Sequence, residues 1–465
     1  MSFKVIKTDK KSSARLGTLK TPHGEIQTPC FMPCGTLGTV KTTTPDELKE
    51  LGVDILLGNT YHLYLRPGDT QIKKLGGLHE FMRWNGPILT DSGGYQVFSL
   101  GREKVKSSKL KVQSKNSKLK NENCDIENSL KIVNCKLKNN VKNLVKIRED
   151  GIEFQSHLDG SKHFFTPEKV IDIQKNLGSD IMMVLDECTP YPATKKYATE
   201  AMERTHNWAL QALEYHKSKP STLNPNPLLF GIIQGSTFKD LREKSAKYIS
   251  SLPFDGIAIG GVAVGEGKQE MYKVINWVTD ILHKNENLVV ENIQYPISNI
   301  QSNSKSKKLG IGHWSLGITG HPRPVYLMGV GTPEDLLEGV ERGIDMFDCV
   351  LPTRLARHGT VWVYDKKTKN QENKKTRNGK LNLLNSEFKN DKKVLMSGCG
   401  CYSCRNGFSR AYIHHLLKEG EVLGIRLTTL HNLNFLLDLM RKIRQNIDKG
   451  TFEQFKNAFL KNWDI

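Results

Sequence analysis

The stretch Gly343-Ile344-Asp345-Met346-Phe347-Asp348-Cys349-Val350-Leu351-Pro352-Thr353-Arg354 predicts a buried strand that delivers a carboxylate to a site, with a cationic turn directly behind it. A short, mostly apolar run leads to Asp348, and a Pro-Thr-Arg turn follows. An isolated example of this pattern also fits a capped strand end with a solvated aspartate. The choice between the two readings depends on whether other segments of the chain repeat the pattern.

Short apolar runs recur along the chain and alternate with amphipathic segments. We expect strands at residues 54–57, 88–90, 181–185, 229–233, 256–259, 324–328 and 346–350. We expect helices at residues 167–176, 199–216, 236–250, 268–282 and 333–341. Thr166-Pro167 and Thr332-Pro333 are typical helix starts, with threonine as N-cap and proline at the first helical position. Seven or eight strand–helix units predict an α/β fold, a (β/α)8 TIM-type barrel, rather than an open doubly wound sheet.

Six predicted strands in succession end in a carboxylate, an amide or a glycine loop. Besides the opening stretch, these endings are Asp91-Ser92-Gly93-Gly94-Tyr95-Gln96, Asp186-Glu187-Cys188-Thr189-Pro190, Gln234-Gly235-Ser236, Gly260-Gly261-Val262-Ala263-Val264-Gly265-Glu266 and Gly329-Val330-Gly331-Thr332-Pro333. In a barrel the chemistry is located at the C-terminal ends of the strands. One such ending is ordinary, but six predict a convergent polar site.

Three aspartates at these strand ends, Asp91, Asp186 and Asp348, suggest the chemistry of the site. Cleavage at an anomeric carbon uses paired carboxylates, because an oxocarbenium-like transition state needs stabilising and the leaving group needs a proton. A carboxylate nucleophile divides the displacement into two easier steps through a covalent sugar–enzyme intermediate. A third acid beside Gln234 and the Gly260-Gly261 backbone suits a purine-like edge. Any one of these aspartates alone could instead cap a helix or turn.

A cysteine cluster near the C-terminus predicts a metal site. Cys399, Cys401 and Cys404 are followed 27 residues later by His431. Three thiolates and an imidazole form a closed tetrahedral zinc site of the structural kind, with no open position for catalysis. Spacing alone leaves His414 and His415 as alternative fourth ligands.

The formal charge of +19 belongs almost entirely to three stretches rich in Lys, Asn and Ser. Residues 101–148 carry 14 Lys/Arg against 4 Asp/Glu, residues 284–308 carry 4 against 2, and residues 364–393 carry 10 against 4. We expect these stretches to be solvated, low-complexity insertions, although a basic arm that holds RNA is the alternative. The net charge therefore says little about the other 362 residues.

The composition favours a cytoplasmic protein. No run of about 18 apolar residues predicts a membrane span, and residues 1–20 lack the apolar core of a secretory signal. Nine cysteines, three of them clustered, suit a reducing compartment with a metal site better than a disulfide framework.

Taken together, the chain resembles the tRNA-guanine transglycosylases, or queuine tRNA-ribosyltransferases, over essentially all of those 362 residues. The motifs that carry the resemblance are Gly58-Asn59-Thr60-Tyr61-His62-Leu63, Leu65-Arg66-Pro67-Gly68, Thr90-Asp91-Ser92-Gly93-Gly94-Tyr95-Gln96, Asp186-Glu187-Cys188-Thr189-Pro190, Gln234-Gly235, Gly260-Gly261, Phe347-Asp348-Cys349-Val350-Leu351-Pro352-Thr353-Arg354 and the Cys-x-Cys-x2-Cys…His set. The resemblance implies an irregular (β/α)8 barrel with a zinc-binding subdomain, here residues 396–445 within one catalytic domain spanning 1–465. It also implies a homodimer.

The activity implied is base exchange in queuosine biosynthesis. Guanine at the wobble position (34) of tRNAs with GUN anticodons, those for aspartate, asparagine, histidine and tyrosine, is replaced by a 7-deazaguanine precursor. Cys188 and Val264 resemble the bacterial form, whose substrate is preQ1 rather than queuine. We expect no further RNA-binding domain after Ile465, which would argue against the archaeal form.

The family's residue roles carry over onto matching positions. The resemblance implies that Asp348 is the nucleophile and that Asp91 is the general acid/base. It implies a base-binding set of Asp91, Ser92, Gly93, Gly94, Tyr95, Asp186, Gln234, Gly261 and Met328. It implies tRNA contacts by Gly329, Val330, Gly331, Thr332, Pro333, Glu334 and Asp335, and by Thr353, Arg354, Leu355, Ala356 and Arg357. The chain departs from the family in its three insertions and in one apparent extra residue around Gly407-Phe408, near the family's dimer interface.

Three rival functions fit parts of the pattern. A non-catalytic RNA-binding subunit of the same fold would have lost the nucleophile or the base-binding acids, whereas Asp91, Asp186 and Asp348 are all present. A zinc-ribbon nucleic-acid binder would not explain six polar strand ends. An unrelated barrel glycosidase would not need the arginines at 354 and 357.

Overall fold

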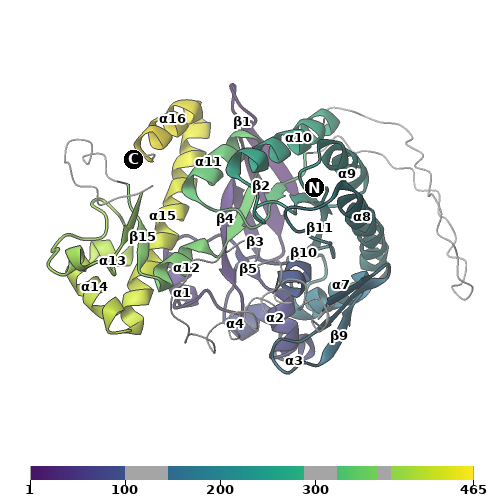
Figure 1. Ribbon diagram of the computed structural model, residues 1–465, viewed down its shortest axis with the longest axis horizontal. Helices are drawn as coiled ribbons and strands as arrows, with labels where there is room; N and C mark the ends of the chain where they lie inside the picture. Colours follow the sequence, from purple (N-terminus) through teal and green to yellow (C-terminus); the bar gives the residue numbers. More distant parts are fainter. Residues whose placement is uncertain (1, 100–144, 287–321, 365–378, 464–465) are drawn as a thin grey trace, which may run out of the picture.

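The computed structural model describes residues 2–99, 145–286, 322–364 and 379–463 (Figure 1). Residues 101–144, 287–308 and 365–378, which make up most of the three predicted insertions, lie outside the described residues. Eight parallel strands form a closed barrel, which confirms the predicted (β/α)8 TIM-type fold. In chain order the strands are β4 (Cys30–Gly35), β5 (Leu56–Gly58), β6 (Ile88–Thr90), β10 (Ile181–Met183), β11 (Leu228–Ile233), β12 (Gly256–Ile259), β13 (Val325–Leu327) and β14 (Met346–Cys349).

Successive barrel strands are neighbours, and the last strand closes the barrel on the first. Met346 of β14 pairs with Cys30 of β4, and Asp348 pairs with Met32. Because all eight strands run in the same direction, their C-terminal ends meet at one mouth of the barrel. The polar segments that follow the strands are therefore brought together, however far apart they lie in the sequence.

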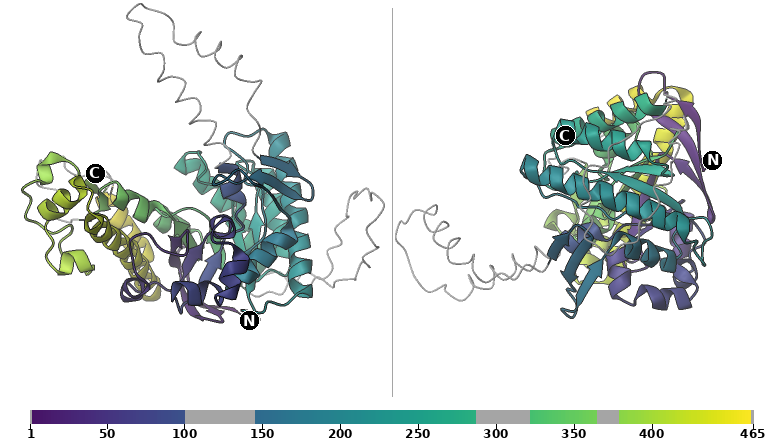
Figure 2. Two further views of the ribbon diagram at one scale, coloured as in Figure 1. Left: turned by 90° about the horizontal axis from the view of Figure 1, so that it is seen from below. Right: turned by 90° about the vertical axis from the view of Figure 1, so that its right-hand side faces the viewer.

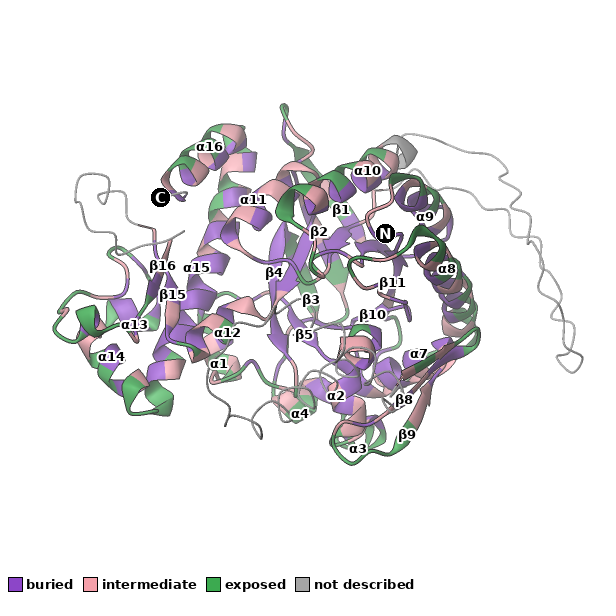
Figure 3. Ribbon diagram, viewed as in Figure 1, coloured by how far each residue is buried: buried purple, intermediate pink, exposed green. Residues whose placement is uncertain are grey.

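The barrel strands are almost entirely buried (Figure 3). Every residue of β10, β12 and β13 is buried. Such continuous apolar runs are typical of parallel strands that are covered on both faces. Side chains from the strands and from the outer helices form one large hydrophobic core.

Five helices that follow barrel strands match the expected alternation. They are α7 (Pro167–Leu177), α8 (Lys195–Ser218), α9 (Lys239–Ser251), α10 (Lys268–Glu286) and α11 (Pro333–Glu341). Thr166 and Thr332 cap α7 and α11 as expected. Helix α8 begins four residues earlier than predicted because Thr194 caps it. Helix α9 begins three residues later than predicted because Gly235 and Ser236 both have positive φ angles.

An antiparallel sheet of three strands lies at the N-terminal end of the barrel and was not predicted. Its strands are β1 (Phe3–Thr8), β2 (Arg15–Thr21) and β3 (Gly24–Thr28). Arg15 forms a buried ion pair with Asp345, at 2.8 Å between Nη2 and Oδ2, directly before β14. His23 contacts Asp180, directly before β10, at 2.7 Å between Nδ1 and Oδ1. The sheet is thus attached to the barrel at the end opposite the predicted site.

Further elements lie between β4 and β10. Short helices near the first strands are α1 (Pro45–Glu50), α2 (Thr60–Leu65), α3 (Asp69–Lys74) and α4 (Gly77–Met82). A second antiparallel sheet, ahead of α7, comprises β7 (Val145–Arg148), β8 (Gly151–Gln155) and β9 (Lys162–Phe165). Strand β7 comprises the last four residues of the predicted insertion 101–148, and these residues pair with β8.

The C-terminal part of the chain forms a unit to one side of the barrel (Figure 2). Its elements are β15 (Thr360–Trp362), β16 (Lys380–Asn382), the 3-10 turn η2 (Ser386–Phe388), α13 (Tyr402–Arg405), α14 (Arg410–Lys418), α15 (Val422–Lys449) and α16 (Phe452–Trp463). Helix α15 contacts β4 and α12 (Leu351–Arg357), and it also contacts β15, α13 and α14. It therefore joins the barrel to the C-terminal unit.

Part of the third predicted insertion belongs to this unit. Strand β16 pairs with β15, and the side chains of Leu381, Leu383 and Phe388 are buried in its core. The Lys- and Asn-rich composition of residues 364–393 obscured these buried positions. Among the helices of the described residues, none has both the length and the apolar character needed to cross a membrane.

Candidate active site and metal centre

Asp348 is the second-last residue of β14. Strong hydrogen bonds hold one of its two carboxylate oxygens. Its side chain is buried, with an exposed fraction of 9%. The Tyr326 hydroxyl and the Gly329 N–H donate to Oδ1, at 2.6 and 2.7 Å. The Cys34 thiol lies 3.5 Å from Oδ2 and is only a weak donor. Burial raises the pKa of Asp348, although the hydrogen bonds from Tyr326 and Gly329 oppose this shift.

Asp91 follows β6 and is fixed by the start of α2. The Asn59 amide donates to Oδ2 at 2.6 Å, and the Thr60 N–H donates to Oδ1 at 2.9 Å. Asn59, directly after β5, also caps α2 by accepting from the His62 N–H. The residue that starts the helix therefore also orients the Asp91 carboxylate. Burial, assisted by the charge of Asp348, raises the pKa of Asp91 to about 7, although hydrogen bonds from the Thr60 N–H, the Gly93 N–H and the Gln96 side chain oppose the shift. A carboxyl group with this pKa can both donate and accept a proton near neutral pH.

Asp186 lies three residues after the end of β10, and two neighbouring loops hold it. Ser92 Oγ donates to Oδ1 at 3.0 Å, and Gln234 Nε2 donates to Oδ2 at 2.7 Å. Burial raises the pKa of Asp186 to about 6, although these two hydrogen bonds oppose the shift. Gln234 is fully buried, and no group of the described residues donates to its Oε1. A buried acceptor of this kind points to a ligand that brings its own donor.

Glycines let the loops approach these polar side chains closely. A Cβ on Gly261 would lie 2.3 Å from Gln234 Oε1, and the residue has a φ of +63°. A Cβ on Gly94 would lie 2.8 Å from the Asp186 carbonyl oxygen. Any side chain at either position would therefore displace the groups around Asp186.

Tyr95 and Met328 are more accessible than the other predicted base-contacting side chains. Tyr95 is 52% exposed and Met328 is half-buried, whereas Ser92, Asp186 and Gln234 are buried. The polar groups thus lie deeper than the two side chains that could cover a flat ligand.

The segment from Gly329 to Asp335 begins beside Asp348, the candidate nucleophile, and ends in the first turn of α11. Gly329 is exposed, but the side chains of Val330, Pro333 and Asp335 are buried. Glu334 pairs with Lys268 at 2.6 Å, and Asp335 accepts from the Tyr272 hydroxyl at 2.6 Å. These two acids are therefore engaged within the protein, and Gly329 is the most accessible part of the segment.

The segment after Asp348 is a helix rather than the turn that its Pro-Thr-Arg sequence predicted. Proline is tolerated here because it stands in the first turn of α12 (Leu351–Arg357). Thr353 and Ala356 are buried, whereas Arg354 is exposed and Arg357 is partly exposed. The pKa of Arg357 is lowered, mainly because the group is partly buried and also because the charge of Arg354 lies nearby. The two guanidinium groups are thus carried by one rigid element directly beyond Asp348.

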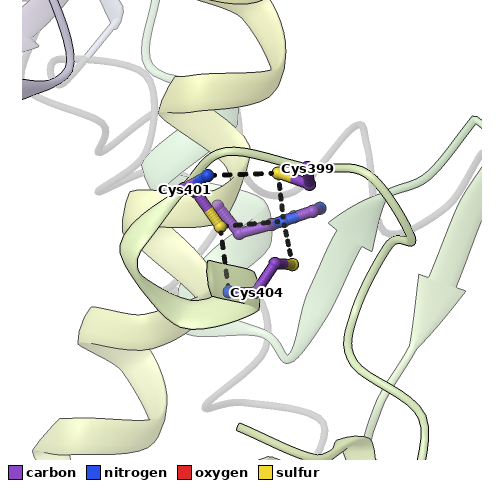
Figure 4. Close-up of side chains that lie close together, drawn as sticks. Cys399, Cys401 and Cys404 are labelled. Carbon is purple, nitrogen blue, oxygen red and sulfur yellow. Dashed lines mark hydrogen bonds between the residues drawn. The ribbon is translucent and has the colours of Figure 1, made fainter. Parts of the chain in front are cut away.

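The predicted zinc ligands converge in the C-terminal unit (Figure 4). His431 Nδ1 lies 3.6 Å from the sulfur of Cys399 and 3.5 Å from those of Cys401 and Cys404. Tetrahedral zinc bonds of about 2.3 Å to sulfur and 2.1 Å to nitrogen place these atoms about 3.6 Å apart. The four residues can therefore bind a metal, and their donor set and spacing fit zinc.

Surrounding groups select His431 as the fourth ligand. Its Nε2 contacts the Trp362 carbonyl at 2.7 Å, which leaves Nδ1 free to face the thiols. Asn434 Nδ2 lies 3.4 Å from the Cys399 sulfur. His414 instead contacts the Leu383 carbonyl, and His415 is exposed on α14.

A second cluster of potential ligands lies at the other end of the barrel. His23 and His79 approach the two oxygens of Asp180 at 2.7 and 3.2 Å. Their rings are stacked, with centroids 3.6 Å apart. Stacked rings do not direct their nitrogens at a common point, and these separations are hydrogen-bond lengths. We therefore interpret this cluster as a hydrogen-bonded link between the N-terminal sheet and the barrel.

Several residues that shape the site carried no recognisable signal. Tyr326 is a single polar aromatic residue within an apolar run, and only the structure shows that its hydroxyl reaches Asp348. Glu187, fully buried beside Asp186, accepts hydrogen bonds from Arg204 and Tyr197 of α8. Arg242 of α9 is also fully buried. Asn59 lies in one of the motifs named above, but the motif did not reveal its contact with Asp91.

Buried carboxylates lie at the C-terminal mouth of the barrel, one with an oxygen that meets only a weak thiol donor among the described residues and another with a pKa of about 7. Such a pair suits a barrel enzyme that acts on glycosidic bonds. The Cys3His cluster in the C-terminal unit narrows this class to barrel enzymes that also carry such a cluster.

Comparison with known proteins gives the family. The sequence model described as Queuine tRNA-ribosyltransferase matches residues 9–135, 135–304 and 295–465. The queuine tRNA-ribosyltransferase of Desulforudis audaxviator is 46% identical over 458 residues, covering 98% of this chain and 97% of that protein. That of Caldanaerobacter subterraneus subsp. tengcongensis is 46% identical over 463 residues, covering 100% and 98%. The chain therefore belongs to the queuine tRNA-ribosyltransferase family and is a pentosyltransferase.

Proposed function

We propose that the protein exchanges guanine at the wobble position of GUN-anticodon tRNAs for preQ1, through a covalent ribosyl intermediate on Asp348. The observation that carries the proposal is the asymmetry of the Asp348 carboxylate. Tyr326 and Gly329 engage Oδ1, whereas Oδ2 meets, among the described residues, only the weak thiol donor of Cys34. Oδ2 therefore keeps the lone pairs that attack the anomeric carbon.

The proposed reaction consists of two displacements. In the first, a carboxylate oxygen of Asp348 forms a bond to ribose C1′, the bond from C1′ to guanine breaks, and Asp91 supplies a proton to the departing base. In the second, the incoming base gives a proton to Asp91 and displaces Asp348 from C1′. A carboxyl group with a pKa of about 7 suits both proton transfers.

Asp186 and Gln234 are proposed to hold the base by its polar edge. Asp186 can accept from the ring N–H and the amino group of guanine, and Gln234 Oε1 is a further acceptor without a donor among the described residues. Ser92, Gly93, Gly94 and Gly261 would form the surrounding backbone. Tyr95 and Met328 would cover the two faces of the base.

The tRNA is proposed to contact the rim next to Asp348. Arg354 and Arg357 suit phosphate or base-edge contacts, and the segment from Gly329 to Asp335 would contribute mainly through Gly329. The exchanged base must leave its stack to reach the barrel mouth, which costs roughly a few kcal/mol.

The remaining assignments rest on the resemblance. We propose structural zinc, one ion per chain, in a subdomain of residues 396–445 within a single catalytic domain, because four protein ligands leave no open position. We also propose a cytoplasmic homodimer. Cys188 and Val264 support preQ1 rather than queuine as the incoming base. Family membership argues against an unrelated barrel glycosidase and against a zinc-ribbon binder.

Replacing Asp348 with Ala or Asn is expected to lower the rate at which labelled guanine is incorporated into tRNA by more than about 1,000-fold, because no covalent intermediate can form. The wild-type protein with tRNA alone should give a covalent complex on a denaturing gel, and both variants should give none. Asp46→Ala, at an exposed carboxylate of α1, is the control and should retain exchange within about twofold. Exchange by a folded Asp348→Ala variant would rule out this nucleophile. The identity of the incoming base is tested by comparing the exchange rate with preQ1 to the exchange rate with queuine.

A further inference from the structure

A guanidinium group without exposed surface lies between the loops that follow β11 and β12. Arg242 of α9 donates from Nε to the Ser236 carbonyl at 2.6 Å and from Nη1 to the Ile233 carbonyl at 3.1 Å. It also donates from Nη1 to the Gly260 carbonyl at 2.7 Å and from Nη2 to the Gly261 carbonyl at 2.9 Å. One side chain therefore connects two loops of the site through four backbone acceptors.

The charge of Arg242 is stabilised by these carbonyl groups, because none of the ion pairs found among the described residues includes it. Burial lowers its pKa to about 10, so the group remains a cation at neutral pH. A buried cation is costly, and an apolar side chain could fill the same volume without that cost. The planar guanidinium is suited to bind several acceptors in fixed directions, which an apolar side chain or a lysine cannot do.

Binding two successive carbonyls fixes the orientation of two successive peptide groups. The peptide bonds of Gly260 and Gly261 are trans, since the cis bonds found in the described residues all precede prolines. In a trans peptide the N–H points away from the carbonyl, so the N–H groups of Gly261 and Val262 point away from the guanidinium. The Gly261 N–H faces the thiol of Cys188, which is a weak acceptor.

The same backbone forms one wall against the proposed base-binding acceptors. A Cβ on Gly260 would lie 3.5 Å from Asp186 Oδ2, and one on Gly261 would lie 2.3 Å from Gln234 Oε1. Backbone donors thus stand beside carboxylate and amide acceptors. This alternation complements a ring carbonyl next to a ring N–H, the arrangement found at the 6-oxo edge of guanine.

We infer that Arg242 is a positioning residue that sets the selectivity of this site for a 6-oxo purine, by fixing the Gly260–Gly261 peptides so that the Gly261 N–H, which faces the weak thiol acceptor of Cys188, is available to the ring carbonyl of the base. The inference rests on the proposed function in that it takes the base to lie between Asp186 and this loop. Arg242 does not touch the base. It acts through the backbone that does.

Binding of guanine and of 6-thioguanine to the full-length, zinc-loaded protein without tRNA tests the inference. The two bases share the N–H and amino donors but differ in the 6-substituent, because sulfur accepts hydrogen bonds weakly. In Arg242→Met the Kd of guanine is expected to rise about tenfold, whereas that of 6-thioguanine should change by less than about threefold. Arg242→Lys should show a smaller effect in the same direction, and it serves as the readout if Arg242→Met does not fold.

Ile249→Val, a truncation in the core of the same helix, is the matched control and should leave the ratio of the two Kd values unchanged. An equal loss of affinity for both bases in the Arg242 variants would show that the residue only supports the fold, and this would overturn the inference. If the wild-type protein binds guanine but does not exchange it into tRNA, the proposed reaction fails, while the ratio of Kd values still decides the role of Arg242. If it binds neither base, both proposals fail.

Discussion

At the scale of single residues, the site separates two carboxyl groups by their hydrogen-bond partners. Asp348 receives two strong donors on one oxygen, whereas strong donors reach both oxygens of Asp91. Both are buried, and the charge of Asp348 contributes to the raised pKa of Asp91. Ionisation of one carboxyl therefore makes ionisation of the other less favourable, which keeps a proton available beside a carboxylate.

This coupling predicts the pH dependence of the first displacement. It requires Asp348 ionised and Asp91 protonated, so kcat/KM for tRNA should fall as the pH rises through about 7, because Asp91 then loses its proton. It should also fall at acid pH, as Asp348 becomes protonated at a pKa above its ordinary value. The two limbs report the pair and not separate residues.

The measurement is the initial rate of guanine exchange at subsaturating tRNA between pH 5 and 9, with the Kd of tRNA measured in parallel. A rate that stays constant up to pH 9 while tRNA binding is unchanged would contradict the role of Asp91 as a proton donor.

Much of the residue-level site could be predicted because strand-end acids and glycines occur in recognisable motifs. The fourth zinc ligand could not be decided from spacing, since the choice depends on Trp362, which fixes the ring of His431. Tyr326 and Arg242 could not be predicted either, because their contacts run to residues far away or to backbone atoms. A sequence pattern records neither.

At the scale of elements, the N-terminal sheet is held to the barrel by a few specific contacts. Asp180 accepts hydrogen bonds from His23 of the β2–β3 turn, His79 of α4, Asn224 and the Ile88 N–H. These partners come from four separate segments, so a single carboxylate fixes their mutual positions.

Replacing His23 with Ala should lower the free energy of unfolding by about 1 kcal/mol, because one hydrogen bond to a buried carboxylate is lost while the others remain. The shift of the urea midpoint measures the effect, and guanine exchange at 25 °C should be nearly unchanged because the site lies at the opposite end of the barrel. His415→Ala, at an exposed position of α14, is the control. A stability equal to that of the wild type would show that the link between sheet and barrel does not depend on His23.

Elements were predicted well where a periodic pattern continues for several residues, as in α7 and α11. The sheet of β1–β3 was not predicted, because its strands carry few apolar residues, and of these Phe3, Leu19 and Ile26 are the ones buried in the large core. The Pro-Thr-Arg sequence predicted a turn where α12 lies. Pro352 stands in the first turn of this helix, where a proline favours a helix.

At the scale of the whole molecule, helix α15 links the metal centre to the barrel. It supplies His431 to the cluster, and it packs against β4, the neighbour of the strand that carries Asp348. The strand–helix alternation predicted the barrel, whereas composition alone did not reveal the buried positions within residues 379–393. A short strand such as β16 with a single buried leucine is not distinguishable by composition from its Lys- and Asn-rich surroundings.

Removing the metal should unfold the C-terminal unit first. Four ligands in a buried cluster become unpaired thiols and an imidazole, so hydrogen exchange should increase in α13, α14 and the first half of α15 before it increases in the barrel strands. Purified protein should contain about one zinc per chain, and Cys401→Ala should contain little. Cys188→Ser, outside the cluster, should keep its zinc. A protein that is equally stable with and without zinc would contradict a structural role.

The pairing of β14 with β4 also has a consequence for synthesis of the chain. The strand that carries Asp348 is the last of the eight to leave the ribosome, and its neighbour β4 is the first. A nascent chain released before residue 346 would already contain Asp91 and Asp186 but not Asp348, the proposed nucleophile. Its barrel would also be open, with the edges of β4 and β13 exposed to pairing with other chains. Incomplete translation therefore yields an aggregation-prone product and not a slow enzyme, since the bond-breaking step becomes possible only when the barrel closes.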